Sequence, residues 1–143
     1  MYNDTDQLFV IFGGLVIVVL IVAIVVFILF LLTLSKFTDA VESQKPETLI
    51  NKAWVWTQLI PIWGFIAMIV FHVKATAAVR AFEVELNEPF NSIQYPVVVG
   101  WFYVLAPLYA WIPFVGGIAS LVMFIIYWVQ ISSTSEQLFS KKQ

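Results

Sequence analysis

The 143-residue chain has no cysteine, one histidine and few charged residues, which make up 11% of the sequence. The lack of cysteine excludes disulfides, thiolate catalysis and cysteine-ligated metals. A single histidine, with no acid inside an apolar run, leaves no ligand set for haem, zinc or a di-iron centre. Lysine and arginine form no cluster of the kind that binds nucleic acid. The sequence therefore predicts a protein that is not an enzyme and that has no cofactor, metal or nucleic-acid partner.

Apolar side chains are abundant instead, at 62% of the residues. A soluble domain carries about a quarter charged residues, so this composition indicates a protein that lies in lipid. Residues 8–34 contain no charge. At ~1.5 Å per residue this run is about 40 Å long, enough to cross a hydrocarbon core of ~30 Å. Its length and its acidic start, at Asp4 and Asp6, argue against a cleaved signal peptide. We predict an all-α integral membrane protein anchored by this helix.

Two apolar segments resemble each other. Residues 60–67 and 112–119 are identical at five of eight positions. A true internal repeat and a chance similarity between apolar segments both remain open. Each segment has a proline followed three residues later by a glycine, which is a turn signal. The predicted structural turns are therefore Pro61 with Gly64 and Pro113 with Gly116.

The second turn lies in an uncharged stretch, residues 93–131, that is too long for one crossing and fits two. We predict a helical hairpin with arms at 95–111 and 118–131. Residues 53–73 around the first turn allow two structures. They form either one crossing helix kinked at Pro61, or a re-entrant hairpin whose short arms reach only the middle of the bilayer. The predicted fold is a single membrane domain with three transmembrane helices plus a re-entrant hairpin; the alternative is four transmembrane helices.

The seven lysines and arginines distinguish these alternatives. Four crossings divide them four against three. Three crossings plus a re-entrant hairpin place all seven on one side, as the positive-inside rule requires. This favours a multi-pass protein of a bacterial inner membrane, with the N-terminus outside and the C-terminus cytoplasmic. Residues 74–87 and 132–143 are then cytoplasmic helical extensions.

A re-entrant turn exposes backbone that other helices must cover. The side chains that we predict as possible contacts with a partner protein are Trp54, Trp56, Gln58, Trp63, His72 and Phe82. Other interpretations stay open for them: an aromatic belt for the tryptophans, a bond to the turn backbone for Gln58, and interfacial hydrogen bonding for His72. Phe82 belongs to an apolar stripe that could bind a partner, lie on the membrane or pack under the chain's own helices. Trp63 and Tyr103 lie deeper, where either a lipid or quinone slot or ordinary packing could place them.

Two apolar stretches, residues 54–63 and 125–132, resemble an uncharacterised family of small bacterial polytopic membrane proteins that is common in Bacteroidota. The likeness covers about residues 54–138, and the family implies no activity and no site residues.

The predicted function is a non-enzymatic accessory or scaffold subunit of a larger inner-membrane complex, in contact with lipid and with other integral membrane subunits. The alternative is a small homo-oligomeric channel or transporter, which would need a polar pore stripe.

Overall fold

The computed structural model describes residues 4–44, 50–60, 62–87, 89, 92–109, 112 and 115–140, and within these ranges it contains helices and no strand. The chain divides into two units, Met1–Leu32 and Thr33–Gln143. Among the described residues, three helices are long and apolar enough to cross a membrane: Gln7–Gln44, Trp63–Glu85 and Gly116–Ser140. The predicted all-helical, multi-pass membrane architecture is confirmed at this level.

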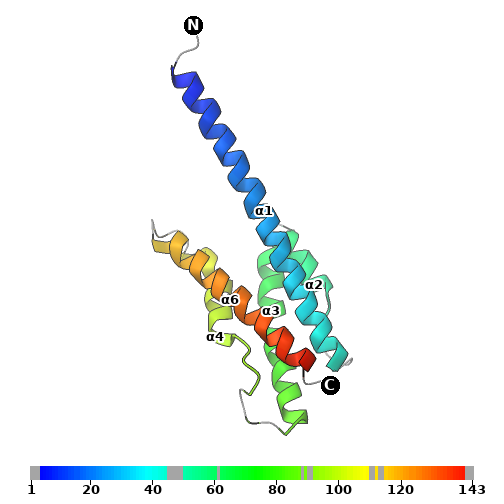
Figure 1. The fold of residues 1–143 in the computed structure, drawn as a ribbon. Coiled ribbons are helices and arrows are strands. Elements are labelled where there is room, and N and C mark those ends of the chain that lie inside the picture. The colour runs from blue at the N-terminus through cyan, green and yellow to red at the C-terminus, as the bar shows by residue number, and fades with distance from the viewer. Residues whose placement is uncertain are drawn as a thin grey trace. The chain divides into compact units, whose positions relative to one another are not determined.

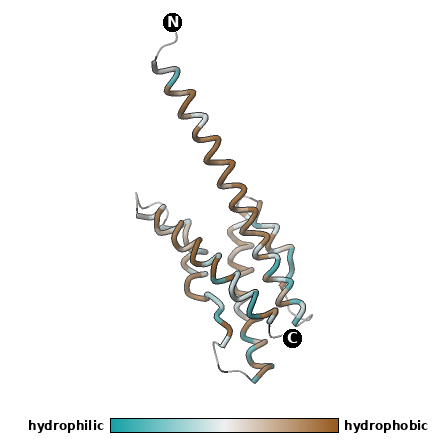
Figure 2. Tube along the Cα trace, viewed as in Figure 1, coloured by the Kyte–Doolittle hydropathy of each residue, from teal (hydrophilic) through white to brown (hydrophobic). Residues whose placement is uncertain are grey.

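The first unit holds the N-terminal part of helix α1, which spans Asp4–Gln44 (Figure 1). Its large apolar side chains are exposed on every face, among them Leu8, Phe12, Leu15 and Ile21. Figure 2 shows this stretch as almost uniformly hydrophobic. A helix that is apolar all round is solvated by lipid rather than by water. This part of α1 therefore has the surface of a membrane anchor.

In the second unit, α1 continues to Gln44. The predicted helix covers residues 8–34, and the observed helix is longer. The helix extends further because Leu34, Phe37 and Val41 form a stripe at helical spacing, and all three are buried. This stripe packs inside the second unit, together with helices α3 (Trp63–Glu85) and α6 (Val115–Ser140).

The ends of α1 and α6 run in the same direction. Trp128 Nε1 donates a hydrogen bond to Thr33 Oγ1 over 2.9 Å, and Gln44 Nε2 donates to the Leu138 carbonyl over 2.7 Å. The two contacts are about equally far apart along each helix, which requires parallel helices. Figure 1 shows the C-terminal ends of the two helices on the same side of this unit.

Helix α3 shares this direction. The rings of Phe37 and Phe71 meet edge to face at 6.3 Å, and Val41, Val79 and Leu138 line one small internal gap further along. Residues further along α1 therefore contact residues further along α3 and α6, which means that the three helices run in the same direction. Three parallel helices require the chain to return twice between them.

The first return is helix α2 (Ala53–Trp56) followed by the 3₁₀ helix η1 (Thr57–Leu59), and both contact α3. The second return is helix α4 (Val97–Val104) followed by α5 (Ala106–Tyr109). The sequence had suggested one continuous arm at residues 95–111. The helix is interrupted at Leu105 because Pro107 has no N–H to donate to the carbonyl four residues earlier, and its ring crowds that carbonyl.

The apolar stripe of residues 74–87 faces the interior. Ala75, Ala78, Val79 and Phe82 are buried, whereas Leu86 is 42% exposed. Phe82 lines the same internal gap as Val41 and Leu138. The stripe therefore packs under the chain's own helices, which is one of the three roles that the sequence left open.

Candidate functional site

The turn between η1 and α3 is tight. The N–H of Ile60 donates to the Thr57 carbonyl over 3.1 Å, and the N–H of Gly64 donates to the Ile60 carbonyl over 2.6 Å. A Cβ atom on Gly64 would overlap the carbonyl of Gln58. Gly64 is therefore required here because no other residue lets η1 approach α3 so closely. The predicted turn prolines, Pro61 and Pro113, lie outside the described residues.

The tip of this turn is Ile62, whose side chain is 89% exposed. Its φ of 67° and ψ of −55° lie in a region that β-branched residues rarely adopt. Such a conformation costs of order 1–3 kcal/mol, and strained residues of this kind gather at functional sites. Among the described residues of the turn, Ile62 is thus both the most exposed and the most strained.

Trp54, Trp63 and Lys74 gather beside the turn. The rings of Trp54 and Trp63 stack with their centroids 6.4 Å apart, and Lys74 Nζ lies 5.3 Å from the centroid of Trp54. Trp56 and Trp63 are 41% and 44% exposed. The stack ties α2 to α3, and the long side chain of Lys74 brings its ammonium group over the same Trp54 ring.

Gln58 is buried in η1. Its Nε2 donates to the Trp54 carbonyl over 3.4 Å, whereas its Oε1 is inaccessible and has no hydrogen-bond partner among the described residues. An inaccessible acceptor with no partner is uncommon in native proteins. The bond to Trp54 lies within the arm itself, and a bond from Gln58 to the turn backbone stays a prediction.

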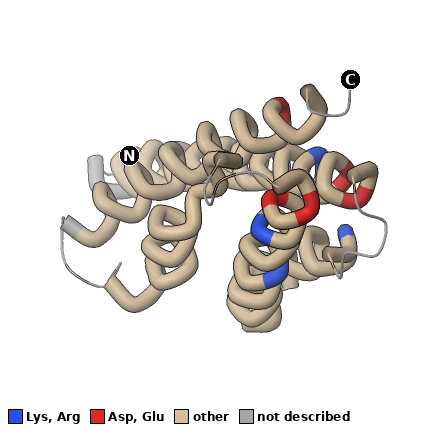
Figure 3. Tube along the Cα trace, turned by 90° about the horizontal axis from the view of Figure 1, so that it is seen from below, with Lys and Arg blue, Asp and Glu red and all other residues tan. Residues whose placement is uncertain are grey.

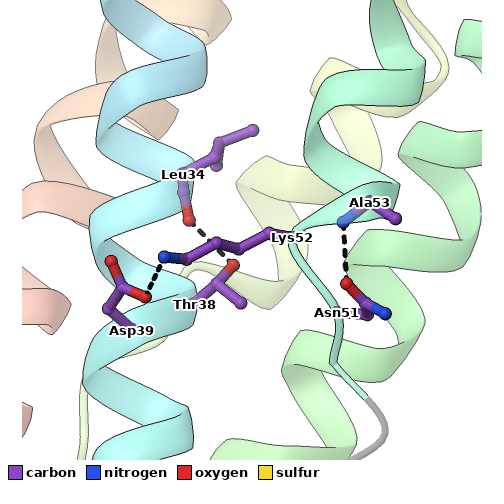
Figure 4. A network of polar contacts seen from close by, with 6 residues as sticks. All are labelled: Leu34, Thr38, Asp39, Asn51, Lys52 and Ala53. Carbon is purple, nitrogen blue, oxygen red and sulfur yellow. Dashed lines mark hydrogen bonds and ion pairs between the residues drawn. The ribbon is translucent and has the colours of Figure 1, made fainter.

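An ion pair fixes the start of the hairpin at α1. Lys52 Nζ lies 2.6 Å from Asp39 Oδ1, and Figure 4 shows the Lys52 side chain reaching from the start of α2 towards α1. The hydrogen bond to Asp39 raises the pKa of Lys52. Nearby, Thr38 Oγ1 donates to the Leu34 carbonyl over 2.9 Å. The α2 arm therefore begins at the level of Asp39.

Charges gather at this end of the second unit. Because Phe37 lies beside Phe71, Lys36 and Lys74 lie at nearly the same level as the Lys52–Asp39 pair. Figure 3, which looks at the molecule from below, shows the described charges gathered in one part of it. Lys36, Lys52 and Lys74 thus define one charged level, which we call the basic level.

His72 lies just above the basic level and is only 1% exposed. Its Nε2 is 3.1 Å from the Val97 carbonyl, and its Nδ1 is 3.2 Å from Tyr95 Oη and 3.4 Å from Tyr127 Oη. A carbonyl only accepts, so Nε2 carries the proton, and Nδ1 accepts from a tyrosine hydroxyl. This arrangement satisfies a neutral imidazole and joins α3, α4 and α6.

Gly100 and Trp101 complete the surroundings of the histidine. A Cβ atom on Gly100 would overlap the His72 ring, and the Trp101 ring meets the imidazole edge-on at 5.3 Å. Sequence analysis named His72 but none of its partners. A glycine inside an apolar helix and two tyrosines in an uncharged stretch, each needing a hydrogen-bond partner, are the signals that point to them.

The segment before α4 is held by two further side chains. Glu83 is 3% exposed, and its Oε1 accepts a hydrogen bond from the Ile93 N–H over 2.9 Å. Thr134 Oγ1 donates to the Gln94 carbonyl over 2.7 Å. A glutamate in the predicted cytoplasmic extension 74–87 would ordinarily face solvent. A buried carboxylate instead accepts a charge-assisted hydrogen bond and fixes the entry to α4.

The deeper aromatic residues have separate surroundings. Tyr103 stacks on Tyr127 at 5.1 Å and meets Phe124 at 5.7 Å, whereas Trp63 stacks on Trp54. Among the described residues, no group of three or more metal-ligating side chains occurs. The features that distinguish the molecule are therefore the strained hairpin tip and the buried histidine.

No family model, curated protein or solved structure matches the chain. The resemblance to a bacterial membrane-protein family stays a prediction, and the function has to be inferred from the hairpin and its surroundings.

Proposed function

We propose that the protein is an accessory or scaffold subunit of a larger inner-membrane complex, and that the tip of its first hairpin contacts a neighbouring subunit. The observation that carries this proposal is Ile62, a strained β-branched residue that is 89% exposed. Glycine would relieve the strain at this position. An isoleucine there is best explained by a contact that its side chain makes outside the chain.

The depth of the tip supports a re-entrant hairpin. Trp63 precedes Phe71 by eight residues, about 12 Å of helix, and Phe71 lies beside Phe37 just below the uncharged run of α1. The seven residues of α2 and η1 rise no further than this. The hydrocarbon core is ~30 Å thick, so the hairpin enters the bilayer and turns near its middle.

The orientation follows from the basic level. Lys36, Lys52 and Lys74 lie together, and Arg80, Lys141 and Lys142 follow on the same side in the proposed path. The positive-inside rule places this side in the cytoplasm and the acidic N-terminus outside.

A hairpin tip at this depth needs a cover. Helix α3 begins after Ile62 without a side-chain cap, and irregular backbone at membrane depth is tolerated only where protein or a water-filled cavity covers it. Leu59 and Ile60 beside the tip are about half exposed. An apolar rim around uncapped backbone fits a transmembrane helix of another subunit.

Topology reporters after residues 40, 88 and 143 test the re-entrant path. All three are expected on the cytoplasmic side. Reporters after residues 40 and 88 on opposite sides would replace the hairpin with a crossing helix and remove the reason for a covered tip.

Partner binding is tested by purifying the tagged full chain in mild detergent. The wild type is expected to bring down other membrane proteins in fixed proportion. Ile62→Gly is expected to lose them, although relief of strain should raise the stability of the chain itself by about 1 kcal/mol.

The matched control is Ile118→Ala, because Ile118 is an exposed isoleucine of the second hairpin. It should retain the partners. A wild-type chain that purifies as a monomer would contradict the proposal, and a chain bound only to copies of itself would favour the channel alternative.

A further inference from the structure

A groove of about 520 Å³ lies on the side of the second unit where α3, α4 and α6 meet. Its volume is within the ~300–1,000 Å³ of typical ligand pockets. Residues 93–99 form one wall, Arg80 of α3 contributes a positive charge, and Gln130 and Ser133 of α6 complete it. The groove is separate from the hairpin tip, so the inference below does not depend on the proposed partner contact.

The groove is polar at one end and apolar at the other. Arg80, Gln94 and Ser133 give the polar end, and Val97, Val98 and Val99 give the apolar end. Val98 is 68% exposed, so this end opens sideways. A soluble ligand has no need of an apolar exit of this kind, whereas an amphipathic molecule matches both ends.

The depth of the groove matches the membrane surface. Val97 lies at the level of His72, whose ring bonds its carbonyl, and Lys74 of the basic level is only two residues further on. Arg80 follows Lys74 by about 9 Å of helix, and its long side chain can reach back towards the boundary. Headgroups occupy ~5–7 Å on each side of the hydrocarbon core. The polar end is therefore at headgroup depth and the apolar end at acyl-chain depth.

We propose that this groove binds one phospholipid with an anionic headgroup, with its phosphate at Arg80 and an acyl chain along Val98 and Val99. Arginine pairs well with phosphate because its fork of N–H donors matches two oxygens. Basic pockets between membrane helices on the cytoplasmic side are sites for anionic headgroups. Gln130 and Ser133 supply hydrogen-bonding groups at the depth of the glycerol.

Hydrogen bonds with three side chains hold the wall of the groove in place. Glu83 and Thr134 hold the segment that forms the groove wall, through the Ile93 N–H and the Gln94 carbonyl. His72 holds the next residues through the Val97 carbonyl. The wall is therefore fixed before the lipid arrives, and binding does not have to order it.

The test uses the delipidated full chain in detergent, to which phosphatidylglycerol or phosphatidylcholine is added, with bound lipid counted by native mass spectrometry. We expect one phosphatidylglycerol per chain and weaker retention of phosphatidylcholine. Arg80→Gln should weaken phosphatidylglycerol binding about fivefold and remove the preference, whereas Arg80→Lys should keep most of it. Lys36→Gln is the charge-matched control, because Lys36 is exposed and does not line the groove. It should bind as the wild type does.

A second variant tests the apolar end without changing charge. Val98→Trp should reduce the retention of both lipids, because its indole would fill the exit, and the exposure of Val98 makes misfolding no concern. Equal binding of the two lipids by the wild type would overturn the proposal, as would equal losses in Arg80→Gln and Lys36→Gln. Displacement of bound phosphatidylglycerol by glycerol 3-phosphate would overturn the lipid as occupant in favour of a soluble phosphate.

Discussion

The two proline-containing turns share one backbone hydrogen bond and differ in packing. In the first turn the N–H of Gly64 donates to the Ile60 carbonyl, over 2.6 Å; in the second the N–H of Gly116 donates to the Ile112 carbonyl, over 3.0 Å. In both, the long helix begins two residues after the proline of the turn. The internal similarity of the sequence therefore coincides with one equivalent hydrogen bond in each turn.

The two turns differ in the space around their glycines. A Cβ atom on Gly64 would overlap Gln58, whereas a Cβ atom on Gly117, beside the second turn, would meet no atom within 4 Å. The arm before the first turn lies tightly against its long helix, and the arm before the second includes the additional helix α4. A turn motif thus determines the local backbone, and the residues before it determine how far the hairpin extends.

The largest expected effect distinguishes these two glycines. Gly64→Ala should destabilise the chain by about 3 kcal/mol, because the clash is with backbone that cannot rotate away. Gly117→Ala should leave stability unchanged or raise it by roughly 0.5–1 kcal/mol, since alanine suits a helix better than glycine. Thermal unfolding in detergent, followed by tryptophan fluorescence, measures both. Similar losses in the two variants would mean that the turns pack alike.

Gly100→Ala is expected to cost about 2 kcal/mol, because the new Cβ would overlap the His72 ring. Here the obstacle is a side chain, so it can be removed. In a His72→Ala background the same substitution should cost almost nothing, and the double-mutant cycle should show a coupling of similar size. Additive losses would indicate that Gly100 is required for another reason.

Tyr127→Phe should cost about 1 kcal/mol, because the hydroxyl lies within hydrogen-bond distance of both His72 and Tyr95. Tyr109→Phe, at the second turn, is the control. Its hydroxyl donates to the Phe102 carbonyl at an exposed position, and its loss should change stability by less than half as much. Urea unfolding of the three proteins compares them, and equal midpoints would exclude a stabilising role for the histidine cluster.

The smallest effect concerns the ion pair between Asp39 and Lys52, at the start of the first hairpin. Asp39 and Lys52 are both nearly half exposed, so Asp39→Asn should lower the melting temperature slightly. The pKa of Lys52 is raised above 10.5 in the folded chain. The pair therefore stabilises fully below pH ~10.5, and its contribution is lost as the pH rises through the raised value. The difference between wild type and variant should shrink there and in high salt; a constant difference would point to another role for Asp39.

The sequence predicted well what lipid alone determines. The anchor at residues 8–34 and the all-helical fold follow from length and lack of charge, and both turn glycines could be located from the Pro-Gly spacing. The break at Leu105 was missed although Pro107 favours one. The reason is that the arm at residues 95–111 was predicted from the length of the uncharged stretch alone. The continuation of α1 to Gln44 was missed because its stripe is only three residues.

The histidine cluster could not be predicted from the sequence. His72 meets Tyr95 and Tyr127 only because α3, α4 and α6 pack together, and residue spacing does not encode that contact. The burial of Glu83 has the same origin, since its partner is a backbone N–H on a different segment. Interactions that depend on tertiary packing were missed, whereas the features that follow from solvation and from the Pro-Gly spacing were found.

The parallel direction of the three long helices has a consequence for how the protein enters the membrane. In the proposed topology each hairpin inserts from the side on which the chain is synthesised, with its tip leading and its ends left behind. The stretch from Tyr109 to Gly116 and the first tip contain no charged residue. Of the residues in this chain, Asp4 and Asp6 are the charged side chains that the first helix carries across, and neither hairpin needs to carry a lysine or arginine through the hydrocarbon.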